Sequence, residues 1–268
     1  MGKKRVIYGL LGFIFILAVM ILGNEYVIDV LFGIIAIVGV HEFYNAFTEK
    51  AKPVRWVGYL SAIFIMFIHI IPNYYLNIIF PLTIPFIMTL LFSQVIITKM
   101  KINFYDIAVT FMGIAYAVAF TMFVPMIFGL TNGKILIWYL MFIAWGTDVF
   151  AYYIGKNLGK HKLTKISPNK TKEGCIGGII GAVIFTAIYT IVVNKYFGLN
   201  INYLYIIIVA ILGSMVSQIG DLAASSVKRY TGVKDFGNLI PGHGGIIDRF
   251  DSIIFIAPFM YALLFSIM

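Results

Sequence analysis

Carboxylate and glycine residues gather near the end of the chain in GHGGIIDRFDS, residues 242–252. Asp248 and Asp251 are three positions apart, so they share one face if this stretch begins a helix. Asp221 lies upstream in SQIGDLAASSVKR, at the edge of another apolar run. Ionisable residues are costly in such positions and usually serve a function. Because the chain has one cysteine and few histidines, the three carboxylates predict a site for Mg²⁺ rather than for zinc.

Positively charged groups surround these carboxylates. The basic side chains in the same region are Lys228, Arg229, Lys234 and Arg249. Gly242, Gly244 and Gly245 precede the predicted start of a helix, where exposed backbone amides and the helix dipole favour a phosphate. A divalent metal, cations and exposed amides are together the equipment of phosphoryl or nucleotidyl transfer, in which catalysis rests on positioning and charge stabilisation.

A second polar stretch, WGTDVFAYYIGKNLGKHKL, ends another apolar run. Its residues Asp148, Tyr152, Gly155 and Gly159 recur at helical spacing and would form one stripe leading to a basic loop. We expect Asp148 to bind a polar ligand or the shell of the metal, although a hydrogen bond between helices is the alternative. The following loop, SPNKTKEG, faces the same side of the membrane as residues 224–247 and offers polar side chains at Ser167, Lys170, Thr171 and Glu173.

Each of these residues also has a purely structural interpretation. Asp221 could form an intramembrane ion pair with a basic residue on its own helix. Asp251 could pair with Arg249 or simply favour the dipole of the first helical turn. His243 could be a hydrogen-bonding turn residue. The combination of all these groups on one side of the membrane is what favours a function.

The elements that must position these residues are apolar helices. Hydrophobic residues make up 61% of the chain and charged residues 12%, against roughly 25% charged residues in a soluble domain. A helix needs about 20 mostly apolar residues to cross a bilayer. The sequence therefore predicts an all-α polytopic integral membrane protein with about nine transmembrane helices. The predicted spans are 6–22, 26–47, 56–71, 74–97, 106–129, 135–155, 175–193, 203–223 and 247–267.

The basic residues indicate how these helices are oriented, because alternate loops lie on opposite sides of a membrane. Of the 20 lysines and arginines only Lys134 and Lys195 fall on one side, so the richer side is predicted to be cytoplasmic. Half of the 20 lie in two loops, 156–172 and 228–249, which argues against nucleic acid as a partner. The segment MGKKR precedes an apolar run without a cleavage site, and we interpret it as part of an uncleaved anchor.

We expect one membrane domain over residues 1–268, in which 1–134 are mainly a scaffold and 135–268 form the catalytic half. Prolines predict a kink or break inside four spans, at Pro81, Pro85, Pro125 and Pro258. Small residues predict close packing of a helix against a neighbour at Gly174, Gly177, Gly178 and Gly181. The single cysteine, Cys175, excludes an intramolecular disulfide and any multi-cysteine metal site.

The stretch SSVKRYTGVKDFGNLIPGHGGIIDRFD, residues 225–251, resembles the signature of the phosphatidate cytidylyltransferases, also called CDP-diacylglycerol synthases. The shared pattern is a serine, the pair KR, the pair KD after four residues, and then HGG and D-R-x-D. The blocks WGTDVFAYYIGKNLGKHKL and SPNKTKEG look like two further stretches typical of that family. The chain departs from the family at Asn169, where a lysine is expected, and at Lys172, where an apolar or aromatic residue is expected.

The resemblance implies that CTP and phosphatidic acid react to give CDP-diacylglycerol and pyrophosphate in the inner (plasma) membrane. It also implies bound Mg²⁺, a potassium ion close by, a homodimer and an active site on the cytoplasmic face. By position, Asp221 and Asp248 would hold the metal, with Lys228, Arg229 and Arg249 as the other catalytic residues. The residues that would contact substrate are Asp148, Lys156, Ser167, Lys170, Thr171, Ser225, Lys234, Asp235, His243, Gly244, Gly245 and Asp251.

The chemistry of the side chains agrees with this reaction. A phosphate monoester has a second pKa of about 6, so phosphatidic acid needs no strong general base, and metal and cations suffice. Two other functions stay open. A related CTP-dependent enzyme could use the same residues on an ether-linked or polyprenol lipid. An ion-coupled transporter is also conceivable, but it would spread its acids through a repeated architecture.

Overall fold

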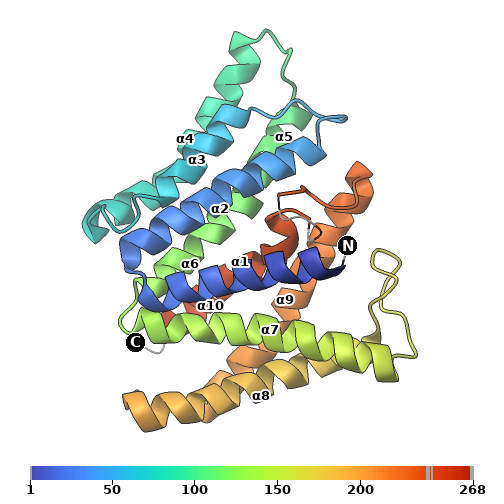
Figure 1. Cartoon of the computed structure of the whole chain (residues 1–268). Coiled ribbons are helices and arrows are strands. Elements are labelled where there is room, and N and C mark those ends of the chain that lie inside the picture. Colours follow the sequence, from blue (N-terminus) through green and yellow to red (C-terminus); the bar gives the residue numbers. More distant parts are fainter. Residues whose placement is uncertain (1, 240–241, 243, 266–268) are drawn as a thin grey trace. The chain divides into compact units, whose positions relative to one another are not determined.

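The computed structural model describes residues 2–239, 242 and 244–265, and these residues are built from helices (Figure 1). The one β-type pairing among them is an isolated bridge between Lys162 and Thr171. The all-α prediction is therefore confirmed for this part of the chain. The chain divides into two compact units, one formed by the residues up to Met126 with Thr231–Arg249, the other by Ile127–Tyr230 with the segment from Phe250 onward.

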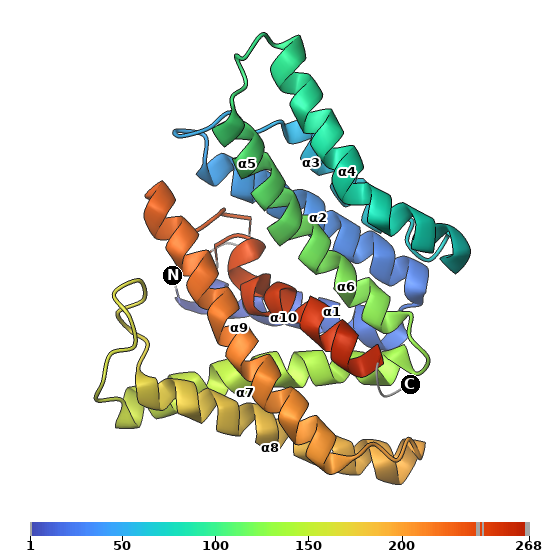
Figure 2. The same ribbon diagram turned by 180° about the vertical axis from the view of Figure 1, so that it is seen from behind.

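The first unit contains the N-terminal helices. These are α1 (Gly2–Leu22), α2 (Glu25–Ala46), α3 (Arg55–Ile65), α4 (Asn73–Ile97), α5 (Phe104–Gly113), the π-helical segment η1 (Ile114–Ala119) and most of α6 (Phe120–Phe128). Helices α2 and α3 lie side by side in both views (Figures 1 and 2) and pack with α5 and η1. Tyr44 is fully buried at this junction, where its ring lies against Gly58 and Gly113 and its hydroxyl donates to the Thr110 carbonyl oxygen at 2.9 Å.

The second unit contains α7 (Gly133–Leu158), α8 (Lys172–Phe197), α9 (Tyr203–Thr231) and the greater part of α10 (Ile247–Phe265). Helices α7 and α8 run side by side along most of their length (Figures 1 and 2). Glycine makes this approach possible, since a β-carbon on Gly181 would lie 2.5 Å from the carbonyl oxygen of Gly146. The predicted packing role of the α8 glycines is confirmed.

Six helical segments among the described residues are long and apolar enough to cross a membrane, so the chain is a multi-pass membrane protein. They are Glu25–Ala46, Tyr74–Ile97, Phe104–Phe128, Gly133–Leu158, Lys172–Phe197 and Tyr203–Thr231. The predicted count of about nine is not confirmed. Helix α3 has 11 residues, or about 16 Å of rise, and the chain turns over residues 66–71. Helix α10 has 19 residues but carries three charged residues in its first turns.

The prolines inside the predicted spans do not break their helices. Helix α4 continues through Pro81 and Pro85, α6 through Pro125, and α10 through Pro258. The irregular turn in this part of the chain is instead η1, upstream of Pro125, where the hydrogen-bonding pattern widens to that of a π-helix. Helices that pass through proline are tolerated in membrane proteins because neighbouring groups satisfy the freed backbone carbonyls.

Candidate active site

The loop ahead of α10 is tied together by Asp248, which lies in the first turn of that helix. Oδ2 of Asp248 accepts hydrogen bonds from the backbone amides of Phe236, at 2.8 Å, and of Gly245, at 3.0 Å. Gly242 and Gly244 adopt φ values of +77° and +86°, in the left-handed region that favours glycine. The loop therefore needs these glycines for its backbone conformation, and it places Asp248 at the junction of its two ends.

A carboxylate that sequence analysis did not single out completes this loop. Glu42 of α2 has 4% of its surface exposed, and its two oxygens accept from the backbone amides of Ile246 and Ile247, each at 3.0 Å. It also lies close to two loop glycines, because a β-carbon on Gly237 or Gly245 would approach a Glu42 oxygen to 2.4 Å. The only signal in the sequence was an acid inside an apolar run, which is a costly placement.

These contacts bear on the predicted phosphate site at the start of α10. The amides of Gly245, Ile246 and Ile247 point to carboxylate oxygens of Asp248 and Glu42 in this structure. A phosphate at this helix N-terminus would have to compete with those carboxylates, and its binding here stays a prediction. His243, which was also predicted to contact substrate, lies outside the described residues.

In the second unit, the predicted residues Asp148, Asp221 and Lys170 come together. Oδ2 of Asp221 on α9 forms an ion pair with Nζ of Lys170, which lies in the loop before α8. Asp148 on α7 interacts electrostatically with both of these groups. An acid on α7, an acid on α9 and a lysine of the loop between α7 and α8 thus interact within this unit, and their roles toward substrate and metal stay predictions.

Asp251 of α10 and Lys228 of α9 belong to the same electrostatic cluster. Asp251 interacts with the carboxylates of Asp148 and Asp221 and with the ammonium group of Lys228. The three carboxylates therefore interact electrostatically within this unit, and lysines from a loop and from α9 offset part of their charge. Such a concentration of acid and cation in an apolar protein is typical of a functional site.

A polar network joins the helices that carry this cluster. The hydroxyl of Thr147 on α7 donates to that of Ser214 on α9 at 2.8 Å. The amide nitrogen of Gln218 on α9 donates to the carbonyl oxygen of Cys175 on α8 at 3.2 Å. These bonds hold α7, α8 and α9 next to one another. Thr147 is one position before Asp148, and Gln218 is about one turn before Asp221.

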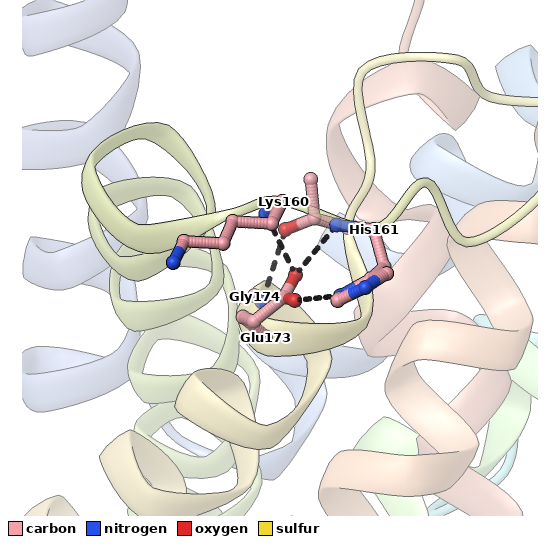
Figure 3. A network of polar contacts seen from close by, with 5 residues as sticks. Lys160, His161, Glu173 and Gly174 are labelled. Atoms are coloured by element: carbon pink, nitrogen blue, oxygen red, sulfur yellow. Dashed lines mark hydrogen bonds and ion pairs between the residues drawn. The ribbon is translucent and has the colours of Figure 1, made fainter.

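The basic loop between α7 and α8 is clamped onto α8 by Glu173 (Figure 3). The carboxylate accepts from the backbone amides of Lys160, at 3.1 Å, and His161, at 3.3 Å, and Nδ1 of His161 lies 2.6 Å from its other oxygen. Thr171 caps the N-terminus of α8, because its hydroxyl oxygen accepts from the Gly174 amide at 3.1 Å. Glu173 and Thr171 thus have structural roles, and substrate contact by Thr171 stays a prediction.

The remaining predicted residues are distributed over α7, α9, α10 and the loops before α8 and α10. Arg229 is exposed and its Nε donates to the carbonyl oxygen of Ile166 at 3.4 Å, which links α9 to the same loop. The ammonium group of Lys156 lies 5.8 Å from the centre of the Tyr152 ring. Ser167 and Ser225 are partly buried, whereas Lys234, Asp235 and Arg249 are exposed. Their contacts with substrate stay predictions.

Among the described residues, no group of three or more His, Cys, Asp or Glu side chains is arranged to hold a metal ion. Asp221 belongs to one compact unit and Asp248 to the other. Their joint ligation of a metal therefore stays a prediction.

Comparison with known proteins gives consistent similarities. A family model described as "Cytidylyltransferase family" matches residues 3–267. The phosphatidate cytidylyltransferase of Bacillus subtilis (strain 168) is 40% identical over 181 residues, 67% of this chain and 66% of that protein, just under two thirds of its length. The corresponding protein of Staphylococcus haemolyticus (strain JCSC1435) is 41% identical over 177 residues, 65% of each chain. That of Staphylococcus aureus (strain COL) is 33% identical over 267 residues, 98% of each chain.

Proposed function

This chain belongs to the cytidylyltransferase family, and on that premise we propose that it transfers the cytidylyl group of CTP to phosphatidic acid. The products are CDP-diacylglycerol and pyrophosphate. The single observation that carries the proposal is the pairing of Lys170 with Asp221, next to Asp148 and Asp251. Such a cluster of carboxylates and cations suits a reaction between two phosphate esters, whose mutual repulsion must be overcome.

In the proposed reaction a phosphate oxygen of phosphatidic acid attacks the α-phosphorus of CTP. The new bond joins that oxygen to the α-phosphorus, the bond between the α-phosphorus and the bridging oxygen breaks, and pyrophosphate leaves. The attacking phosphate is largely a dianion at neutral pH because its second pKa is about 6. It needs no strong base, and the task of the side chains is to hold and neutralise the reacting phosphates.

The donor set of this chain fits Mg²⁺. Mg²⁺ is usually held by one or two carboxylates together with water and substrate phosphates, rather than by a complete protein cage. Asp221, a partly exposed carboxylate, is a donor of this type. We propose Asp221 and Asp248 as the protein ligands. When bound, Mg²⁺ supplies charge neutralisation at the phosphate oxygens. A potassium ion as second cation, a homodimer and a cytoplasmic active site are part of the same proposal.

The basic residues would then bind phosphate oxygens. Lys170 and Lys228 lie in the electrostatic cluster of the second unit, and Arg229 lies beside the loop that carries Lys170. If Lys170 moved from Asp221 to a phosphate, the carboxylate of Asp221 would lose its partner and would be free to bind the metal proposed above. Lys234 and Arg249, which are exposed in the first unit, would serve the same purpose on the loop before α10.

The test is direct transfer of label. Purified protein in mild detergent is supplied with phosphatidic acid, base-labelled CTP and Mg²⁺, and the organic phase is counted, with Asp248→Asn and Asp221→Asn run in parallel. We expect label in the lipid fraction that is lost in both variants and on chelation of the metal. Absence of transfer from folded protein across several phosphatidic acids, with potassium present, would overturn the proposal. Transfer to an ether-linked or polyprenol lipid instead would assign the related activity.

A further inference from the structure

Glu42, near the C-terminal end of α2, is a buried acid with an unusual set of neighbours for an apolar helix. Its carboxylate is almost fully removed from solvent, with 4% of the residue exposed, and no cation pairs with it in the salt bridges of the described residues. Its oxygens instead accept from the amides of Ile246 and Ile247, the first backbone donors of α10. Burial of a carboxylate is costly unless hydrogen bonds compensate it, and here the N-terminus of α10 provides that compensation.

Residues 42 and 43 of α2 contact both ends of the loop that precedes α10. At the far end Glu42 binds the amides of residues 246 and 247, and at the near end it packs against Gly237. The neighbouring ring of Phe43 stacks on that of Phe236, with centroids 6.3 Å apart and planes inclined by 15°. Phe236 is itself buried, and its backbone amide donates to Asp248.

We propose that Glu42 is a positioning residue for cytidylyl transfer, which acts by holding Gly237 and the residues at the start of α10 so that Asp248 is presented in one orientation. The inference rests on the proposed function, in which Asp248 is a metal ligand. It assigns a role in the reaction to a helix of the N-terminal part of the chain. Glu42 does not touch the reacting atoms.

The geometry explains why glutamate is needed at this position. Two amides point to two oxygens of one side chain, whereas a glutamine in the same position offers one oxygen and turns its NH₂ group toward the other amide, and an alanine offers none. The two glycines that face Glu42 leave no space for a side chain on the loop, because any β-carbon there would lie 2.4 Å from a carboxylate oxygen. Glutamate and glycines therefore form one interlocking contact between α2 and the loop.

The first arm of the test compares Glu42→Gln and Glu42→Ala with a matched control, Asp29→Asn. Asp29 is also a fully buried acid of α2, but its carboxylate contacts His69 and not the loop. Loss of a direct partner of a metal-ligating group lowers metal affinity or activity by about 10- to 100-fold, and because Glu42 acts on Asp248 only through the loop, we take the lower end, about 10-fold. We expect a loss of that size in kcat/KM for Glu42→Ala and a smaller loss for Glu42→Gln. Both variants should need a higher Mg²⁺ concentration than the wild type to reach half of their maximal rate. Asp29→Asn should keep the Mg²⁺ dependence of the wild type.

The second arm measures the loop itself, without any reaction. Hydrogen exchange followed by mass spectrometry should show faster exchange in the peptide that covers residues 236–250 for both Glu42 variants, and not for Asp29→Asn. Gly237→Ala, which displaces Glu42 without removing its charge, should give the same result. The inference would be overturned if the wild type is active and the Glu42→Ala variant has the exchange rate and the Mg²⁺ dependence of the wild type. If the wild type transfers no label, the proposed function has failed, and the exchange data still report whether Glu42 holds the loop.

Discussion

Replacement of Lys170 by methionine tests the electrostatic cluster of the second unit, because it removes the charge and keeps most of the side-chain volume. The Lys170 and Asp221 side chains retain 26% and 32% of their exposure, so the pair is neither a surface pair nor fully buried. Exposed pairs contribute about 0.2 to 1 kcal/mol, and removal of one partner of a buried pair costs about 3 to 5 kcal/mol. For this half-buried pair, screened by solvent, we expect the free energy of unfolding to fall by about 1 to 2 kcal/mol.

The same substitution should impair the reaction more than the stability. A hydrogen bond to a charged group is worth about 1.5 to 3 kcal/mol, so loss of one phosphate contact should lower kcat/KM by about 10- to 100-fold. Unfolding is measured in mixed micelles by circular dichroism, and transfer by label in the organic phase. Lys165→Met, an exposed lysine of the same loop, is the control and should behave as the wild type.

A double-mutant cycle with Asp221→Asn separates the pair from its surroundings. Because each substitution removes the same interaction, the double variant should be less destabilised than the sum of the two single variants. Strict additivity, within about 0.3 to 0.5 kcal/mol, would show that Lys170 and Asp221 are not coupled. Unchanged transfer in Lys170→Met would refute the assignment of Lys170 to a substrate phosphate.

Three further substitutions test the supports of this cluster. Glu173→Ala removes the acceptor of three donors from the basic loop, so limited proteolysis should cut residues 159–171 faster than in the wild type, and an unchanged cleavage rate would contradict the clamp. Thr171→Ala should lower the free energy of unfolding by about 1 kcal/mol through loss of the α8 cap, and Thr171→Ser should restore it. Gly181→Val should destabilise the protein by about 1 to 3 kcal/mol or prevent folding, since its side chain would meet the backbone of Gly146. Gly12→Ala, where no atom lies within 4 Å of the added carbon, is the control and should not lower the free energy of unfolding, since alanine is favoured over glycine inside a helix.

Much of the fold could be predicted because an apolar run long enough to cross a membrane folds locally as a helix. The predicted span 26–47 corresponds to Glu25–Ala46, and 135–155 to Gly133–Leu158. The prediction was wrong at 56–71, where helix α3 ends at Ile65. The residues that follow are as apolar as the helix itself, so hydropathy could not distinguish an apolar turn from another helical turn.

The candidate site was predictable where its residues lie in recognisable local patterns. Lys170 and Asp221 were both singled out, and the structure pairs them. Glu42 was not, because its role depends on contact with residues more than 200 positions away in the chain. A buried acid in an apolar run is not a sufficient signal, since Asp29 on the same helix gives the same signal and contacts only His69 in the hydrogen bonds described.

The carboxylates of the candidate site share one physical property that links stability to the proposed chemistry. Asp221 has a lysine partner, and Asp248 and Glu42 have backbone amides as partners, so each negative charge is compensated within the fold. Such compensation lets an apolar protein keep carboxylates that would otherwise be too costly to bury. Lysines and amides are also the groups that bind phosphate. In either unit, a phosphate that binds these lysines or amides would therefore compete with carboxylates for donors already in place.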